Sequence, residues 1–328
     1  MTEQVTVLYI GGRGRSGSTI LARTLGQIPG FVNVGELSQV WHRGLQENER
    51  CGCGQPFHSC EFWRAVGEEA FGGWDNVDVD KMVGFMPYLE RQRYAPHYAL
   101  AATTGIRTRK MNTLLEECGA ALERLYRAIQ RVSGADVIVD SSKRFSYAVL
   151  LSLLPFGDLR VVHLVRDSRA VAYSWARSRE STVGRRLRSQ GWTLAARLSP
   201  GYQSRVWSLQ NYSYSCLSAF ASLSRLRYED FVNDPAFYLG ETLIKAGFDD
   251  GAGDLPVVRG QEISLSVDHM VSGNPGRFRA GNIELQPDEE WKVKMRGADK
   301  SVVTVLTAPL LLKYGYLGSK QTSKWQRC

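Results

Sequence analysis

An apolar run that ends in a glycine-rich turn constrains the fold of this chain more than any other feature. Residues 5–10 read VTVLYI, and residues 12–19 read GRGRSGST. A strand, a tight turn and a helix start in this order direct backbone N–H groups and the positive end of a helix dipole at one anion. The segment therefore predicts a phosphate-binding loop between a first strand and a first helix.

The loop departs at one position from the nucleotide-binding pattern G-x-x-x-x-G-K-[ST]. Gly12, Gly17 and Thr19 fit the pattern, but Ser18 occupies the lysine position. A kinase or ATPase of that class needs the lysine ammonium on the β- and γ-phosphates. Because the cation here is Arg15, two residues before the second glycine, we expect the loop to hold a phosphate-like group for a different transfer chemistry.

The rest of the chain alternates short β-rich runs with longer helical patterns, which predicts a parallel sheet with helices on both faces. Strands are expected at residues 5–11, 31–34, 136–140, 159–165 and 226–228. Helices are expected at residues 18–26, 111–132, 145–154, 168–179, 203–223, 235–246, 288–295 and 301–313. The 328 residues are expected to form one domain, with an acceptor-side insertion at about 45–108 and a mobile basic loop at about 181–200.

The composition of the chain argues against a nucleic-acid partner and against stable membrane insertion. The net charge of +8 is spread along the chain, without a basic tail or a basic run interleaved with aromatic residues, so a nucleic-acid partner is not expected. No apolar stretch is long enough for stable membrane insertion, and no signal segment is recognisable. These features favour a cytoplasmic protein whose six cysteines are mostly thiols.

A second charged turn follows the expected strand at residues 159–165. Arg166 stands at the strand end, and Ser174 lies eight residues later on the expected helix. A guanidinium and a hydroxyl in this arrangement are suited to holding a second phosphate. Taken alone, the segment is better interpreted as an Arg166–Asp167 surface pair followed by an ordinary helical serine; the lysine-less phosphate-binding loop shifts the interpretation toward a phosphate site.

Together, the two segments resemble the sulfotransferases that use 3′-phosphoadenosine 5′-phosphosulfate (PAPS), and most closely the bacterial and Golgi-type members. In that family a loop [KR]-S-G-[ST]-T binds the 5′-phosphosulfate, and residues 15–19 read RSGST here. The family segment R-D-x-R-x-x-x-x-S binds the 3′-phosphate, and it is complete at residues 166–174. The resemblance implies the P-loop-NTPase-like sulfotransferase fold, an α/β three-layer sandwich with a central parallel β-sheet, with PAPS as the donor and PAP as the product.

Two weaker elements agree with the resemblance. Residues 226–231, LRYEDF, are similar to the family segment whose tyrosine, here Tyr228, lies near the adenine. Residues 273–281, GNPGRFRAG, are similar to the late loop that closes over the 3′-phosphate in bacterial members. The resemblance thus implies that the donor is bound by Gly14, Arg15, Ser16, Gly17, Ser18, Thr19, Arg166, Ser174, Tyr228, Arg277 and Arg279.

The expected reaction is in-line transfer of the sulfuryl group to a hydroxyl of a small-molecule, glycan or lipid acceptor, with an amine as the less favoured acceptor. Arg15 is expected to stabilise the charge that develops on the transferred and leaving groups. No metal is expected, because the loop and the arginines supply positive charge. A P-loop kinase and a non-catalytic nucleotide-binding protein on the same fold remain alternatives.

Glu36, after the second expected strand, is the first candidate for the general base. Related tyrosylprotein sulfotransferases use a glutamate in a similar Gly-Glu segment, although Glu36 could equally cap the following helix. Lys143 is expected to assist Arg15 at the leaving group, as a lysine does in those relatives; otherwise it is a surface lysine at a helix start. His269 is an alternative base, and His163 is expected in the core.

Cys51, Cys53 and Cys60, with His58 between them, invite a structural zinc site. The C-x-C spacing is tight and no paired C-x-x-C is present. The sequence therefore favours packed thiols first, then a disulfide, then zinc.

Overall fold

The computed structural model describes residues 4–90, 94–155, 157–177, 199–217, 222–248, 255 and 257–318. The chain divides into two compact units, one of Met1–Leu164 with Tyr214–Pro287 and one of Val165–Ser213 with Asp288–Cys328. The single domain expected from the sequence stays a prediction. The basic loop expected at about 181–200 lies almost wholly outside the described residues.

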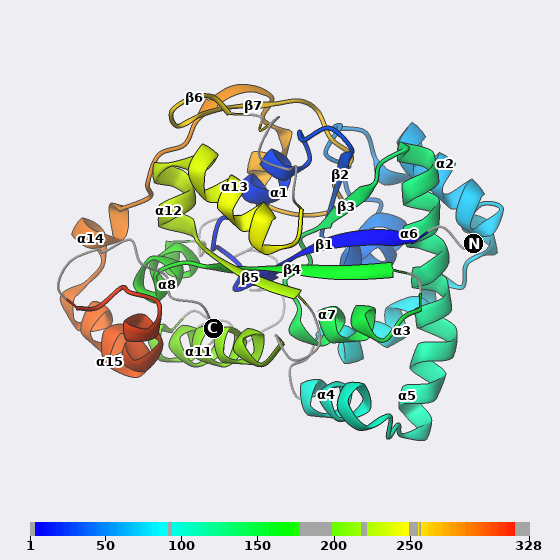
Figure 1. Ribbon diagram of the computed structural model, residues 1–328. Helices are drawn as coiled ribbons and strands as arrows, with labels where there is room; N and C mark the ends of the chain where they lie inside the picture. The colour runs from blue at the N-terminus through cyan, green and yellow to red at the C-terminus, as the bar shows by residue number, and fades with distance from the viewer. Residues whose placement is uncertain are drawn as a thin grey trace. The chain divides into compact units, whose positions relative to one another are not determined.

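A five-stranded sheet in the order β2-β3-β1-β4-β5 forms the centre of the first unit (Figure 1). Strand β1 pairs in parallel with β3 and β4, and β2 pairs in parallel with β3. The strands are β1 Val5–Gly12, β2 Phe31–Gly35, β3 Val137–Asp140, β4 Gly157–Val165 and β5 Ser222–Arg227. All five expected strands are confirmed, with shifts of a few residues at their ends.

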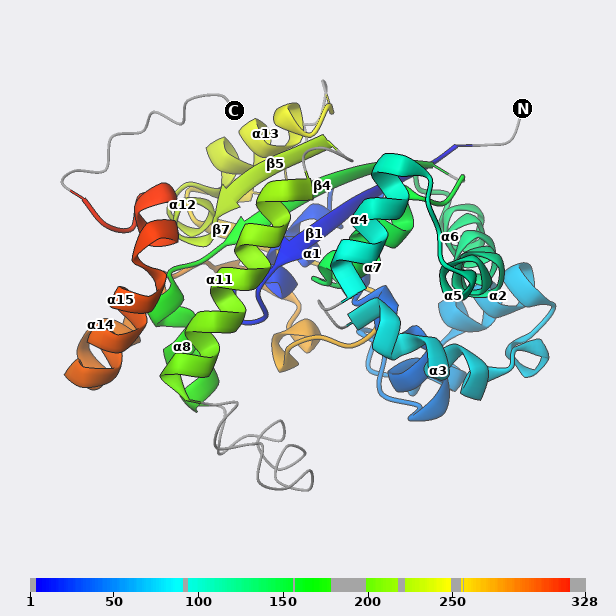
Figure 2. The same ribbon diagram turned by 90° about the horizontal axis from the view of Figure 1, so that it is seen from below.

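Alternation along β1 builds a core on each face of this sheet. Val7 and Tyr9 belong to one buried cluster with α6 and α7, whereas Leu8 and Ile10 belong to another with α1 and α13. Figures 1 and 2 show α7 and α13 on opposite faces, so the expected three-layer α/β sandwich is confirmed. These helices are α1 Ser18–Leu25, α6 Ala120–Ser133, α7 Phe145–Ser152, α12 Tyr228–Asn233 and α13 Pro235–Lys245.

The segment expected as an insertion is mainly helical and packs into the core that contains α6 and α7. It contains η2 Val40–Gln46 (a π-helix), η3 Phe57–Ser59, α2 Glu61–Phe71, η4 Trp74–Asn76, α3 Val79–Glu90 and α4 Ala95–Thr104, after a short η1 Leu37–Gln39. The helix expected at 111–132 is built from α5 Arg109–Thr113, the π-helical η6 Leu114–Gly119 and α6.

A small antiparallel sheet in the order β6-β7-β8 lies between residues 257 and 284, where the sequence predicted no strand. Its strands are β6 Val257–Arg259, β7 Glu262–Leu265 and β8 Gly281–Glu284, with the 3-10 turn η8 Pro275–Phe278 between the last two. The connection between β7 and β8 contains both His269 and the late loop.

The second unit is helical. Its helices are α8 Ser168–Arg177, most of α11 Pro200–Leu217, α14 Glu290–Lys294 and α15 Gly297–Lys313. Its core includes Val171, Trp207, Leu311 and Tyr314. The helix expected at residues 203–223 is wrong at its end, because Ser222 already belongs to β5.

In the described part of the chain, no helix combines the length and the apolar character needed to cross a bilayer.

Candidate functional site

The loop after β1 has a backbone conformation that depends on its glycines. Gly12 has a φ of 134°, and a Cβ there would lie 2.3 Å from the carbonyl oxygen of Leu164. Gly17 has a φ of 90°, and a Cβ there would lie 2.4 Å from Cδ2 of Tyr228. Arg15 is left-handed too, with a φ of 73°. The ring of Tyr228 therefore lies against the loop, and Arg15 is held in a conformation that costs a non-glycine residue free energy.

Helix α1 begins directly on this loop, with Gly17 as its N-cap and no side-chain hydrogen bond to the cap. Ser16 is 1% exposed, and its Oγ has no hydrogen-bond partner among the described residues. The first N–H groups of a helix also need partners from outside the helix. A buried hydroxyl beside uncapped helix N–H groups suits an anion such as a phosphate.

Arg23, on α1, hydrogen-bonds to the late loop. The sequence analysis did not identify this residue. Its side chain is 1% exposed and its Nε donates to Asp268 Oδ2 at 3.2 Å. Its two terminal nitrogens donate to three backbone carbonyls: Nη2 to Ser266 at 2.8 Å, and Nη1 to Gly276 at 3.1 Å and to Arg279. A cation on the buried face of a short helix was the only signal of this role in the sequence.

The late loop also reaches the phosphate-binding loop directly, since the backbone N of Asn274 donates to Thr19 Oγ1 at 3.4 Å. Arg277 is buried and donates from Nη1 to the Gly273 carbonyl at 2.8 Å and from Nη2 to the Arg50 carbonyl at 3.2 Å. Burial lowers the pKa of Arg277. These contacts fix the loop backbone, and binding of the 3′-phosphate by Arg277 and the exposed Arg279 stays a prediction.

Glu36 and Lys143, the two other catalytic candidates, form an ion pair. Lys143 Nζ lies 2.7 Å from Glu36 Oε1, and the side chains are 13% and 20% exposed, respectively. Glu36 directly follows β2 and Lys143 follows β3, so the carboxyl ends of two neighbouring parallel strands bring them together. Lys143 has a φ of 62°, which is costly for a residue with a side chain.

Two opposing effects set the pKa of Glu36. Burial alone would raise this pKa, but the charge and hydrogen bond of Lys143, together with Arg43 and Arg144, outweigh burial and lower it. Glu36 is therefore ionised at neutral pH and able to accept a proton.

Asp140, at the end of β3, holds the turn that carries Lys143. Its Oδ1 accepts from the Ser142 backbone N at 2.8 Å and from the Ser142 hydroxyl, and its Oδ2 accepts from Tyr126 Oη. The Ser142 hydroxyl in turn accepts from the backbone N of Ser38 at 2.9 Å. The carboxylate thereby links the turn after β3 to the segment after Glu36, a role that the sequence analysis did not anticipate.

The Asp140 network predicts a pH dependence of stability. Burial raises the pKa of Asp140 to about 6, although hydrogen bonds from Ser142 and Tyr126 oppose the shift. Since the folded state binds this proton more tightly than the unfolded state, stability falls as pH rises between the unfolded pKa and about 6. A shift of this size corresponds to roughly 3 kcal/mol at most.

We therefore expect the stability of wild type relative to Asp140→Asn to fall by up to that amount between about pH 4 and pH 7. Urea denaturation of both proteins across this range measures the difference. A difference that is independent of pH would show that Asp140 titrates normally.

In the second unit, Arg166 follows β4, and α8 begins at Ser168, as the strand–turn–helix pattern predicts. Arg166 is 6% exposed, and its Nη2 lies 2.9 Å from Asp288 Oδ2. Arg166 and Asp167 are both buried and not on the surface, and Asp167 accepts from Arg169 through both carboxylate oxygens. Ser174 lies on α8, partly exposed.

The histidines separate into core and cluster residues. His163 is fully buried in β4 and stacks on Tyr214, with ring centroids 5.1 Å apart, which confirms the expected core position. His269 is partly exposed, and its Nδ1 lies 3.3 Å from Cys60 Sγ. Cys51, Cys53 and Cys60 are not joined by disulfides.

Comparison with known proteins yields structures only: no family model matches the chain, and no curated protein matches it. One similar solved structure is the "Sulfotransferase Domain from the Curacin Biosynthetic Pathway", with a TM-score of 0.52, 16% identity, and coverage of 94% of this chain and 98% of that chain.

Sulfotransferase STF1 from Mycobacterium tuberculosis H37Rv has a TM-score of 0.41 at 14% identity, covering 76% of this chain and 69% of that chain. Sulfotransferase STF9 from Mycobacterium avium has a TM-score of 0.41 at 14% identity, covering 75% of this chain and 64% of that chain. The likeness to the curacin domain, over nearly the whole of both chains, shows that this chain has the fold of a sulfotransferase domain.

Proposed function

We propose that this protein is a PAPS-dependent sulfotransferase that transfers the sulfuryl group to a hydroxyl of a small-molecule, glycan or lipid acceptor. The observation that supports the proposal most is the loop at residues 12–19. Its Gly12, Arg15 and Gly17 have left-handed φ values directly before the start of α1, and serine stands in place of the kinase lysine. The sulfotransferase fold adds support of a general kind.

The donor is assigned to the two sequence signatures. The backbone N–H groups of residues 16–19, with Gly14 allowing close approach, would hold the 5′-phosphosulfate. Arg166 and Ser174 would hold the 3′-phosphate, and Tyr228 would lie near the adenine. The carboxylate of Asp288, now on Arg166, would give way to the incoming phosphate.

The transfer step needs stabilised charge and a proton acceptor. The acceptor oxygen forms a bond to sulfur while the bond from sulfur to the bridging phosphate oxygen breaks, and PAP leaves with the bond's electron pair. Arg15, assisted by Lys143, would neutralise the charge that builds on these oxygens. The acceptor proton would pass to Glu36, which the pair with Lys143 keeps ionised. His269 is the weaker candidate for the base, because its Nδ1 faces the thiol of Cys60.

PAP is expected to raise the melting temperature selectively, because a ligand that binds only the folded state at one hundred times its dissociation constant adds about 2.7 kcal/mol of stability. The measurement is a thermal shift with PAP, with ATP–magnesium and adenosine monophosphate as comparison ligands. Arg166→Ala is expected to abolish the PAP shift.

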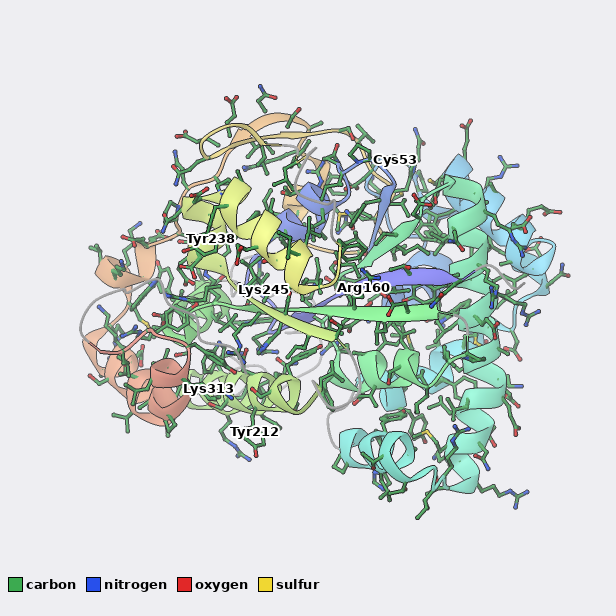
Figure 3. All side chains as sticks on the ribbon, viewed as in Figure 1. Cys53, Arg160, Tyr212, Tyr238, Lys245 and Lys313 are labelled. Carbon is green, nitrogen blue, oxygen red and sulfur yellow. The ribbon has the colours of Figure 1, made fainter. Side chains whose placement is uncertain are left out.

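Arg160→Ala is the matched control. Arg160 lies on β4, the strand that Arg166 follows (Arg160 is labelled in Figure 3). It pairs with Asp158 and donates to the Gly247 carbonyl, so its loss should lower stability without removing the PAP shift. No PAP shift, or a preference for ATP–magnesium, would overturn the proposal in favour of a kinase.

A further inference from the structure

Three cysteines and one histidine meet beside the end of β2. The ligand atoms of Cys51, Cys53, Cys60 and His269 all lie within 4.8 Å of one another. The three cysteines are close in sequence, but His269 is 209 residues from Cys60. The tertiary fold therefore completes a set of four metal-ligating groups that the sequence leaves incomplete.

Four of the six distances among these atoms are close to those found around a single metal ion. The Cys60 sulfur lies 3.6 Å from that of Cys51 and 3.7 Å from that of Cys53. Nδ1 of His269 lies 3.3 Å from the Cys60 sulfur and 3.8 Å from the Cys51 sulfur. In a tetrahedral zinc site, two sulfurs lie about 3.8 Å apart, and a sulfur and an imidazole nitrogen about 3.6 Å apart. A disulfide needs about 2.05 Å, so the spacing matches a metal site.

The histidine is held in place as a ligand would be. Its ring stacks on Phe62, with centroids 4.9 Å apart and planes at 14°. Its carbonyl accepts a hydrogen bond from Trp63 Nε1 at 2.8 Å. By contrast, His58, which the sequence places among the cysteines, bonds the Leu45 carbonyl through Nε2 at 2.8 Å.

We propose that Cys51, Cys53, Cys60 and His269 bind one structural zinc ion. Three thiolates and one imidazole are a ligand set that suits zinc, and four protein ligands leave no open position for a substrate. Cys51 and Cys60 are each 1% exposed, which suits a closed structural site (Cys53 is labelled in Figure 3). The sequence ranked zinc last for these cysteines because the C-x-C spacing is tight and no paired C-x-x-C is present, and it suggested His58 as the histidine instead of His269.

The ion would hold residues 269–271, the segment that lies beside Glu36, in place. The backbone N of Gly52 donates to the Met270 carbonyl at 3.0 Å, and the backbone N of Glu36 donates to the Val271 carbonyl at 2.8 Å. Residues 269–271 thus run between the cysteine segment and the end of β2. Loss of the ion should therefore make residues 269–271 and the start of the late loop less ordered.

Metal analysis of the full-length protein, purified under reducing conditions without chelator, tests the proposal directly. We expect one equivalent of zinc, released when a mercurial reagent blocks the thiols. After removal of zinc, we expect one equivalent of Co²⁺ to bind, with the sulfur-to-cobalt charge-transfer and intense visible bands of a tetrahedral thiolate site. Absence of zinc together with no cobalt spectrum, or a disulfide among these cysteines in peptide mass spectrometry, would overturn the proposal.

The zinc content of single-residue variants tests which residues bind the ion. Cys53→Ser and His269→Ala are expected to lower the zinc content at least severalfold, and Cys118→Ser and His58→Ala are expected to retain it. Cys118 is a buried free thiol outside the cluster, so its variant controls for loss of a core cysteine. Full zinc in Cys53→Ser and His269→Ala would contradict the assignment. If these variants do not fold, the cobalt spectrum of the wild-type protein decides.

Discussion

Arg15→Ala is expected to lower kcat for sulfuryl transfer by about 10²- to 10³-fold, since removing one positioned donor from a developing oxyanion costs about 3–4 kcal/mol of barrier. The left-handed φ of 73° at Arg15 means that the loop backbone sets the origin of this side chain. Because the charge that Arg15 stabilises develops in the transition state, the dissociation constant of PAP should change far less than kcat.

Transfer from radiolabelled PAPS to an acceptor found by screening, or to water, measures this effect. Arg13→Ala is the matched control, because it removes an arginine from the same loop two residues away. Equal losses of kcat in the two variants would show that Arg15 contributes only to the general positive charge of the loop.

Glu36→Gln is expected to lower kcat by about 10²- to 10⁴-fold, the usual contribution of a positioned general base. PAP should still stabilise this variant, because the phosphate-binding residues are unchanged. Glu47→Gln is the control: Glu47 lies nearby on the chain, pairs with His42 at 3.5 Å, and should tolerate the change with little loss of kcat.

The pH profile of the wild-type enzyme gives a second test of Glu36. Lys143 lowers the pKa of Glu36 against the raising effect of burial, so kcat should stay level on the acid side until below the ordinary glutamate value of 4.5. The stabilisation from the Glu36–Lys143 pair is likewise present above that value and lost as pH falls through the lowered pKa. A fall in kcat near neutral pH that Glu36→Gln leaves in place would assign the base to another group.

The sequence predicted those parts of the protein whose structure depends mainly on interactions between residues close together in the chain. The run before Gly12, the glycines of the loop and the start of α1 follow from strand patterning and from turn chemistry. The meeting of Glu36 and Lys143 follows from parallel topology, because both stand where neighbouring strands end. Both features were therefore predictable once the sheet was recognised.

The remaining features depend on contacts between distant segments. The β6–β8 sheet was missed because its strands are short and lie in a glycine-rich region without clear alternation. Arg23, Asp140 and His269 gain their roles only when segments far apart in the sequence come together. A single sequence carries no pairing signal for such contacts, which is why it suggested the neighbouring His58, and not the distant His269, as the partner of the cysteines.

A crystal structure of the full chain with PAP tests the central claim most directly. The account predicts the 5′-phosphate within hydrogen-bonding distance of the backbone amides of residues 16–19, and the 3′-phosphate on the guanidinium of Arg166 with Asp288 displaced. Binding of the nucleotide away from residues 12–19, or with its 3′-phosphate in solvent and Arg166 still paired to Asp288, would contradict it.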